Sequence, residues 1–186
     1  MKGEGTKTWV VFFLVVLSAF SRLIPHPSNF TAIGALAIYS SLVFPYRGWG
    51  IVLPLLAMWI SDLVINNVIY AAYQPQFVFF SEGFVWIYLG LVAHSVSALW
   101  LGKRKNIAGI ASASVVGAVA FFLLSNFGVW AGSSMYPHSI EGLSACYVAA
   151  LPFLGNFLAG NVFFCGVLFG IHYFLERNTR LFQMGV

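Results

Sequence analysis

The sequence predicts an all-α integral membrane protein, a single bundle of about six transmembrane helices that takes up residues 1–186. Of the 186 residues, 60% are hydrophobic and only 8% are charged, whereas charged residues make up about a quarter of an ordinary soluble domain. The apolar residues form runs near the length of a bilayer crossing, and the Lys and Arg residues fall in alternate connections. These observations exclude a soluble domain and also predict where the two termini lie.

Six apolar runs follow one another along the chain, and each is the centre of a predicted helix: 8–24, 31–45, 49–70, 84–101, 107–131 and 156–175. About 20 apolar residues cross the hydrocarbon core, so the short second run is expected to be tilted or partly re-entrant. The first run has no small-residue cleavage site before Ile24, which predicts a retained helix and not a cleaved signal. At its length, the stretch 143–153 is expected to form a separate interfacial or re-entrant helix.

The positions of the basic residues predict that both termini are cytoplasmic. Eight of the nine lie in the N-terminus, the second and fourth connections and the C-terminus: Lys2, Lys7, Arg47, Lys103, Arg104, Lys105, Arg177 and Arg180. The other three connections hold only Arg22, at the end of the first helix. Since cytoplasmic loops carry the excess of Lys and Arg, the net charge of +4 reflects membrane orientation, and no nucleic-acid partner is predicted.

Several residues are expected to serve packing alone. Small residues spaced four apart permit close helix approach, and they occur in the fifth run as Gly109, Ala113 and Gly117 and in the sixth as Gly166 and Gly170. Cys146 and Cys165 are interpreted as buried apolar side chains. His94, alone in its helix, is interpreted as a hydrogen-bonded core histidine. No metal or other cofactor is predicted, because the His and Cys spacings fit no metal motif.

Polar residues converge on the outer half of the predicted bundle, where they form a candidate binding site. Intramembrane polar groups usually face the protein interior and often mark function. The candidate substrate-binding residues are Arg22, His26, Asn29, Trp59, Asp62, Asn66, Asn126, Trp130, Tyr136, Asn156 and Asn161. Aromatic rings beside amide and carboxylate groups suit a planar, hydrogen-bonding small molecule. The alternative is that these side chains only tie helices together.

Two of these residues, Arg22 and Asp62, are expected to pair, because neither charge is inexpensive to leave alone in the membrane. The pair serves either structure alone or a ligand, to which Arg22 would present its planar donor fork. Pro25 and Pro27 restrict the backbone around His26. This predicts a stiff outer loop that either caps the site or only ends a helix.

Four sequence segments resemble an uncharacterised bacterial membrane family labelled as transport proteins. They are 22–31 (Arg-Leu-Ile-Pro-His-Pro-Ser-Asn-Phe-Thr), 61–63 (Ser-Asp-Leu), 126–130 (Asn-Phe-Gly-Val-Trp) and 136–137 (Tyr-Pro), and 146–153 continues the similarity. That family in turn resembles the substrate-binding S components of energy-coupling-factor (ECF) vitamin transporters. The resemblance implies six helices, cytoplasmic termini, an outward-facing cup and a location in the bacterial cytoplasmic (inner) membrane.

The chain departs from these families in two places. Asn161 stands where the resemblance leads us to expect Asp. The first helix lacks the Ala-x-x-x-Ala pattern with which many S components dock their energising module. An energising ATPase module is therefore a possible partner, but the missing pattern argues against it. The chain has no Gly-x-x-x-x-Gly-Lys phosphate loop of its own.

The leading functional hypothesis is a substrate-binding and transport protein, with the bilayer and a small polar, planar solute as its partners. The solute would be vitamin-like or nucleobase-like and would bind in a cup open to the outer side. One alternative is a ligand-free membrane scaffold or assembly subunit. A membrane enzyme using His26, His138, Asp62 and Glu141 is a further alternative. The prediction is nevertheless that the chain is not an enzyme, since no Gly-x-Ser-x-Gly or His-x-x-x-His motif occurs.

Overall fold

The structure, a computed structural model, describes residues 13–44, 46–104 and 106–178. Within them the chain is helical, and no strand occurs. Helical residues 13–20 precede α2 (Ile33–Val43), α3 (Trp49–Val64), α4 (Phe84–Leu101), α5 (Ile107–Gly132) and α6 (Ile140–Asn178). Three shorter helical segments complete the described chain. The π-helix η1 (Ile65–Ile69) extends α3, and η2 (Ala71–Tyr73) and η3 (Gly102–Arg104) are 3-10 turns.

Four of these segments are long and apolar enough to cross a membrane: Trp49–Ile69, Phe84–Leu101, Ile107–Gly132 and Ile140–Phe174. They confirm four of the predicted membrane-length apolar helices. The start of the first predicted helix, with Lys2 and Lys7, lies outside the described residues, as do Lys105 and Arg180. The second run forms α2, whose 11 residues are fewer than a crossing needs.

Helix α2 lies at the centre of the bundle. Ten of its 11 residues are buried, and it packs against α3, α4 and α6. A helix that is apolar on all sides is expected to be enclosed by protein or lipid, and here protein encloses it. The short run is therefore a central packing element of the bundle.

The prediction of a separate helix at 143–153 is wrong, because this stretch is continuous with the sixth run in α6. Pro152 lies inside the helix. Proline removes one backbone hydrogen bond but is tolerated in membrane helices when neighbouring groups compensate. No turn-forming residue other than Gly155 separates the two stretches, so nothing stops the helix between them.

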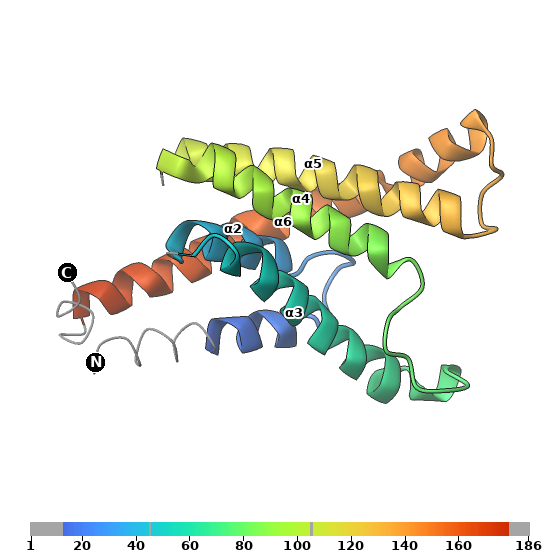
Figure 1. Cartoon of the computed structure of the whole chain (residues 1–186), viewed down its shortest axis with the longest axis horizontal. Helices are drawn as coiled ribbons and strands as arrows, with labels where there is room; N and C mark the ends of the chain where they lie inside the picture. The colour runs from blue at the N-terminus through green and yellow to red at the C-terminus, as the bar shows by residue number, and fades with distance from the viewer. Residues whose placement is uncertain (1–12, 45, 105, 179–186) are drawn as a thin grey trace.

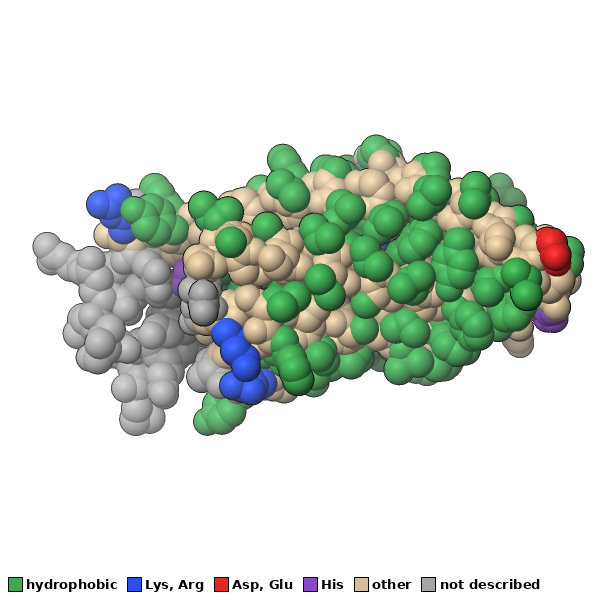
Figure 2. Space-filling model, turned by 90° about the horizontal axis from the view of Figure 1, so that it is seen from above, with side chains coloured by type: hydrophobic (Ala, Val, Ile, Leu, Met, Phe, Trp, Pro, Cys, Tyr) green, Lys and Arg blue, Asp and Glu red, His purple; other side chains and the backbone are tan. Residues whose placement is uncertain are grey.

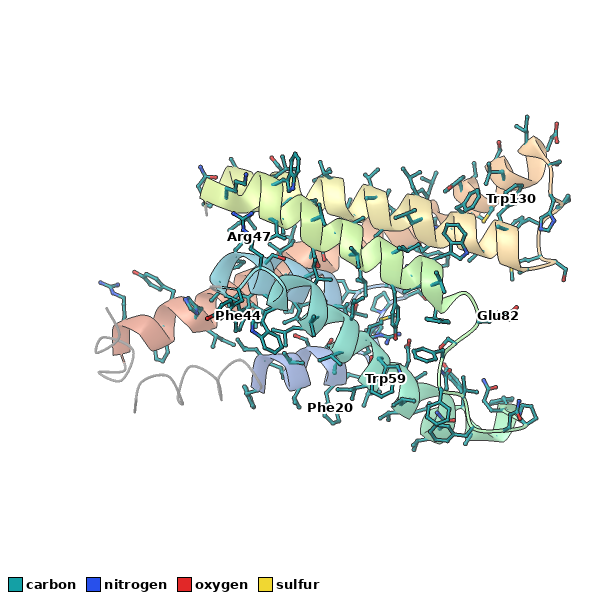
Figure 3. All side chains as sticks on the ribbon, viewed as in Figure 1. Phe20, Phe44, Arg47, Trp59, Glu82 and Trp130 are labelled. Carbon is teal, nitrogen blue, oxygen red and sulfur yellow. The ribbon has the colours of Figure 1, made fainter. Side chains whose placement is uncertain are left out.

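The charged residues mark the two ends of an elongated bundle. Lys and Arg side chains lie at one end of the face drawn in Figure 2 and an acidic side chain at the other, with apolar side chains between them. In Figure 3, Arg47 lies toward the end opposite to Glu82 and Trp130. Arg47, Lys103 and Arg177 belong to connections or ends that the positive-inside rule assigns to one side of the membrane, whereas Arg22 lies apart from them in the ion pair with Asp62.

Glycine spacing identifies close packing on one helix but not on the other. Gly117 of α5 lies against His94 and Ser97 of α4, and a side chain in its place would overlap the His94 ring. Gly166 and Gly170 of α6 have open space around them. Among the described residues, the expected close contact at Gly166 and Gly170 is therefore wrong. These two positions lie on the outside of this chain.

The connection between residues 20 and 33 is recessed into the bundle. In Figure 1 it lies near the middle of the long axis, whereas α3 and α5 extend well beyond it. The segment 13–20 and α2 thus occupy one half of the bundle length, and the other half holds parts of α3, α4, α5 and α6. The connection is the base of that second half and not an outer cap.

Candidate functional site

The one ion pair among the described residues joins the recessed connection to α3, as the sequence predicted. Arg22 Nη1 donates to Asp62 Oδ1 at 2.6 Å, to Ser61 Oγ at 2.6 Å and to the Met58 carbonyl oxygen at 3.3 Å. The two charged side chains are only 17% and 11% exposed. The Tyr88 hydroxyl of α4 lies near enough to interact electrostatically with both charges. All of these contacts of the guanidinium with α3 are made through one nitrogen, Nη1.

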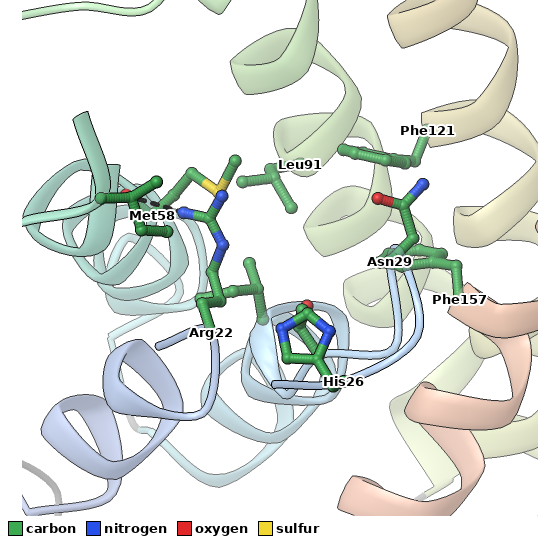
Figure 4. A pocket seen from close by; sticks show the side chains of 10 residues that line it. Arg22, His26, Asn29, Met58, Leu91, Phe121 and Phe157 are labelled. Atoms are coloured by element: carbon green, nitrogen blue, oxygen red, sulfur yellow. Dashed lines mark hydrogen bonds between the residues drawn. The ribbon is translucent and has the colours of Figure 1, made fainter. Parts of the chain in front are cut away.

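A partly open pocket of about 170 Å³ adjoins this ion pair. Its lining comes from the recessed connection and from all five labelled α-helices or their ends: Arg22, His26, Asn29, Thr31, Ile33, Met58, Ile65, Leu91, Phe121 and Phe157. Figure 4 shows Arg22 and Met58 on one side and Asn29, Phe121 and Phe157 on the other. Three predicted site residues, Arg22, His26 and Asn29, are therefore brought together at one cavity.

The apolar wall of the pocket is aromatic. The rings of Phe121 (α5) and Phe157 (α6) stack with centroids 4.8 Å apart and an interplanar angle of 20°. Leu91 of α4 lies between this wall and Arg22 in Figure 4. The pocket thus combines a flat apolar surface with a cation and a few polar groups, which is the usual make-up of a small-molecule site.

The backbone of the recessed connection is fixed by local turns and by α6. Asn29 has a φ of 65°, a left-handed conformation that Asn tolerates better than most residues. Asn156 of α6 donates from Nδ2 to the Ser28 carbonyl oxygen at 3.0 Å. Gly160 lets α6 approach the backbone of Phe30 and Thr31. Asn156 therefore supports the pocket from behind and does not line it.

His26 belongs to the same turn. Its Nδ1 lies 2.8 Å from the Pro27 carbonyl oxygen, to which it can donate. In that tautomer Nε2 is the hydrogen-bond acceptor of the ring. The ring lines the pocket beside Arg22 (Figure 4).

Three side chains of α3 and η1 hold the segment that leads to α4. Trp59 Nε1 donates to the Phe79 carbonyl oxygen at 3.2 Å, and Asn66 Nδ2 donates to Ser81 Oγ at 2.8 Å. Asn67 donates to the Val78 carbonyl oxygen and accepts from the Val78 amide, at 2.9 and 2.7 Å. These contacts support the alternative that polar side chains here only tie elements of the bundle together. Trp59 and Asn66 are not among the residues that line the pocket.

The predicted residues at the far ends of α5 and α6 are more dispersed. Asn126 donates to the Phe122 carbonyl oxygen of its own helix at 2.8 Å and lines a narrow second cavity of about 10 Å³ that shares Asn29 with the first. Trp130 Nε1 donates to the Pro137 carbonyl oxygen at 2.9 Å. Tyr136, in the turn between the two helices, is half-buried and lines neither cavity.

Asn161 and His94 do not line the pocket but lie in the packed interior. Both are completely buried, and the Asn161 amide lies against Gly34 of α2. The Phe157 ring contacts His94 edge-on at 5.5 Å and separates it from the pocket. Among the described residues, no hydrogen bond of good geometry satisfies either side chain. His94 is thus a core histidine, but its expected hydrogen-bond partner is not found in this part of the chain.

Several pocket residues were not identified from the sequence: Thr31, Ile33, Met58, Ile65, Leu91, Phe121 and Phe157, together with Tyr88 beside the ion pair. Most are apolar residues in apolar runs, and one pair of rings cannot be singled out among 19 Phe residues. Only Thr31 and Tyr88, hydroxyl-bearing residues within predicted apolar runs, offered a signal. Among the residues that the structure describes, no group of three or more His, Cys, Asp or Glu side chains could hold a metal ion.

The fold and the site define the class of this protein: a helical membrane protein with a partly open pocket, lined by apolar and polar side chains, between several of its apolar helices. The chain belongs to a family of unknown function, DUF6580, which matches residues 2–182. No curated protein and no solved structure matches it. The family match carries no function and gives no link to the S components of ECF transporters.

Proposed function

We propose that the protein binds a small polar, planar solute in the pocket beside Arg22 and takes part in its transport across the membrane. The observation that carries the proposal is the position of Arg22. A cation within a membrane bundle is costly and usually functional. Here it lines a cavity of about 170 Å³ and also pairs with Asp62. A purely structural ion pair has no need of an adjoining cavity.

The proposed direction of access follows from the distribution of charge. Arg47, Lys103 and Arg177 belong to connections or ends assigned to the cytoplasm, and the pocket lies in the other half of the bundle. A cup open to the outer side of a bacterial cytoplasmic membrane fits this arrangement. The proposal keeps the S-component-like architecture as a working hypothesis, supported by the resemblance of segments 22–31 and 126–130. It includes no ATPase partner, because residues 8–24 lack the Ala-x-x-x-Ala docking pattern.

The proposal is tested by ligand-dependent stability of the purified protein in lipid nanodiscs. A ligand that binds only the folded state adds about 2.7 kcal/mol of stability at 100 times its Kd. Screening vitamins, nucleobases and their precursors should therefore yield compounds that raise the unfolding temperature by several degrees. Proteoliposomes should then accumulate or exchange the same compounds. The absence of any shift across the panel would remove the basis of the proposal.

A ligand-free scaffold is the second candidate, and the geometry of Arg22 Nη1 favours it. That one nitrogen contacts Met58, Ser61 and Asp62, which ties the recessed connection to α3. If this tie were the whole role of Arg22, Arg22→Ala and Asp62→Ala would lower the yield of folded protein while uptake per folded molecule stayed unchanged. Measuring yield and uptake on the same preparations separates the two functions.

We further propose that the protein is a binder and not an enzyme. The pocket lining contains one imidazole, from His26, and no carboxylate, since Asp62 is not among its residues. General acid–base chemistry normally needs positioned groups of complementary protonation state. Elemental analysis of the purified protein addresses the metalloenzyme alternative, because a stoichiometric metal would argue against a simple binder.

A further inference from the structure

We infer that the solute is a neutral molecule with a single planar ring that carries a carbonyl or amide oxygen. In this arrangement Arg22 donates to the oxygen while the ring packs on Phe121 and Phe157. The inference rests on the proposed function and specifies its ligand. It follows from the size of the pocket, the donors that remain on Arg22, the charge of the site and the aromatic wall.

The volume of the pocket limits the ligand to one ring. Ligand sites for drug-sized molecules usually measure about 300–1,000 Å³, and a cavity of about 150 Å³ in another protein accommodates benzene. At about 170 Å³, the space here fits a six-membered ring with a small substituent. A fused two-ring system would have to extend beyond the enclosed part of the pocket.

The donors that face the ligand come from Arg22. Its Nη1 supplies all of its hydrogen bonds to Met58, Ser61 and Asp62. Among the described residues, Nε and Nη2 make no hydrogen bond, and Arg22 lines the pocket. A guanidinium edge with free donors is matched to planar groups with accepting oxygens. The ligand must therefore present a carbonyl-type oxygen toward Arg22.

The charge balance of the site favours a neutral ligand. Asp62 already compensates the Arg22 charge at an Nη1–Oδ1 distance of 2.6 Å, and no other residue lining the pocket is acidic or permanently charged. A carboxylate ligand would add a second anion for one cation in a partly desolvated space. Burying an uncompensated charge is far more costly than burying a hydrogen-bonded neutral group. A neutral carbonyl avoids this cost.

The aromatic wall formed by Phe121 and Phe157 favours a planar ligand. Phe121 and Phe157 stack at 4.8 Å and line the pocket together with Leu91. Aromatic pairs favour offset-stacked or edge-to-face arrangements, with an energy beyond that of area burial alone. Asn29, beside this wall in Figure 4, offers an amide to the ring edge. A flat ring thus fits between the wall and Arg22 better than a branched aliphatic solute.

The test compares matched probes by titration calorimetry on the full chain in nanodiscs. Nicotinamide and uracil are neutral single rings with carbonyl oxygens. Nicotinate and orotate are their ring-carboxylate counterparts, and hypoxanthine is a neutral two-ring probe. We expect at least one neutral single-ring probe to bind, with at least tenfold higher affinity than its carboxylate counterpart and than hypoxanthine.

The variants separate ligand contact from folding. Arg22→Lys keeps a cation for Asp62 but removes the planar donor edge, so it should weaken the bound neutral probe at least tenfold while the protein still unfolds cooperatively. Arg47→Lys is the matched control, because Arg47 is exposed and lies toward the end of the bundle opposite to Glu82 and Trp130 (Figure 3). It should leave the affinity for the probe unchanged. Phe121→Leu should weaken the same probe three- to tenfold.

The outcomes distinguish this inference from the function on which it rests. Tighter binding of nicotinate or orotate, or of hypoxanthine, would overturn the inference and leave the solute-binding function standing. Binding of neutral probes that Arg22→Lys does not weaken would also overturn it. If neither these probes nor the wider panel of vitamins and nucleobases binds, the inference and the proposed function both fail.

Discussion

The two halves of the bundle treat polar side chains differently. In the half built around α2, Ser40 Oγ donates to the Leu36 carbonyl oxygen and Ser97 Oγ to that of Ala113. Other buried polar groups of this half, Ser18 Oγ, Ser95 Oγ and the Asn161 amide, make no hydrogen bond among the described residues, and they line neither cavity. In the half that holds the pocket, Arg22 has donors beyond those that bind α3. What distinguishes a candidate site is therefore neither the number of polar residues nor the number of unpaired polar groups, but unpaired donors on a residue that lines a cavity, as Arg22 does.

Packing differs in the same way. Around α2, ten of 11 residues are buried, and Gly34 lies directly against Asn161 and Phe157. Near the pocket, α3 diverges from α4 and α5 toward the end that bears Glu82 (Figures 1 and 3), and a cavity remains. Interiors packed to native density have little room to adjust, so substitutions should be costly in the first half for steric reasons and in the second for electrostatic ones.

The largest effect is expected where the ion pair of the pocket half is broken. Asp62→Ala leaves Arg22 without its counterion in a largely buried position, and removing one partner of a buried pair costs about 3–5 kcal/mol. Since the two side chains keep 17% and 11% exposure, we expect about 3 kcal/mol. Reversible unfolding in mixed detergent micelles measures the loss.

The control is the double substitution Arg22→Met with Asp62→Leu, which removes both charges. Because no charge is then left unpaired, the double variant should be clearly more stable than Asp62→Ala alone. A double variant as unstable as the single one would show that Asp62 acts through packing, and the electrostatic side of the comparison would be lost.

The next effect tests steric packing in the α2 half. A side chain at Gly34 would overlap the Asn161 amide and the Phe157 ring, and overpacking a close-packed interior typically costs about 1–3 kcal/mol. Gly34→Ala should therefore destabilise the protein by about 2 kcal/mol in the same unfolding assay.

Gly166→Ala is the matched control for Gly34→Ala, since Gly166 is helical and has open space around it. Alanine is the better helix former by up to about 1 kcal/mol, so this variant should be as stable as the unsubstituted protein or more stable. Equal losses for the two variants would indicate that overlap with Asn161 and Phe157 is not what destabilises Gly34→Ala.

A smaller loss of stability is expected on replacing Asn67. Its side-chain amide makes two hydrogen bonds to the Val78 backbone and one to the Leu63 carbonyl oxygen. Each intramolecular hydrogen bond contributes about 0.5–1.5 kcal/mol net, and Asn67 is only partly buried. Asn67→Ala should cost about 1–2 kcal/mol and speed proteolysis within residues 70–83. Ligand affinity should stay unchanged, and a large loss of affinity would place Asn67 with the site residues.

The sequence was sufficient for the helices and for part of the site, for identifiable reasons. Runs such as 84–101 and 107–131 match bilayer thickness, and two opposite charges in an apolar chain have few partners to choose from, which is why Arg22 and Asp62 were paired correctly. The boundary between 143–153 and 156–175 was placed wrongly because the length of 143–153 suggested a separate short helix, whereas α6 runs through both stretches without a break.

The depth of the recessed connection could not be derived from the sequence. Hydropathy places Arg22, His26 and Asn29 at the end of a helix, but how far that end reaches depends on the short length of α2 and on its enclosure by α3, α4 and α6. The aromatic wall is hidden for a similar reason, since which Phe rings face one another depends on helix rotation. Asn66 and Asn156 are polar residues of a type common in binding sites. Only their hydrogen-bond partners, Ser81 and Ser28, show that they tie elements of the fold together.

The smallest effect is expected at Asn161, where the α2 half contains a polar group that the fold does not use. Its amide is fully buried, and among the described residues neither of its polar atoms makes a hydrogen bond. Replacing such a group by an apolar one of similar shape is nearly neutral or stabilising. Asn161→Leu should therefore stay within about 1 kcal/mol of the unsubstituted protein, on the stabilising side. Asn161→Asp, which keeps the size but adds a charge, should lower stability as the pH is raised and the carboxyl ionises. A loss of more than about 2 kcal/mol in Asn161→Leu would mean that this amide is bonded after all and that the interior of the α2 half does use this polar group.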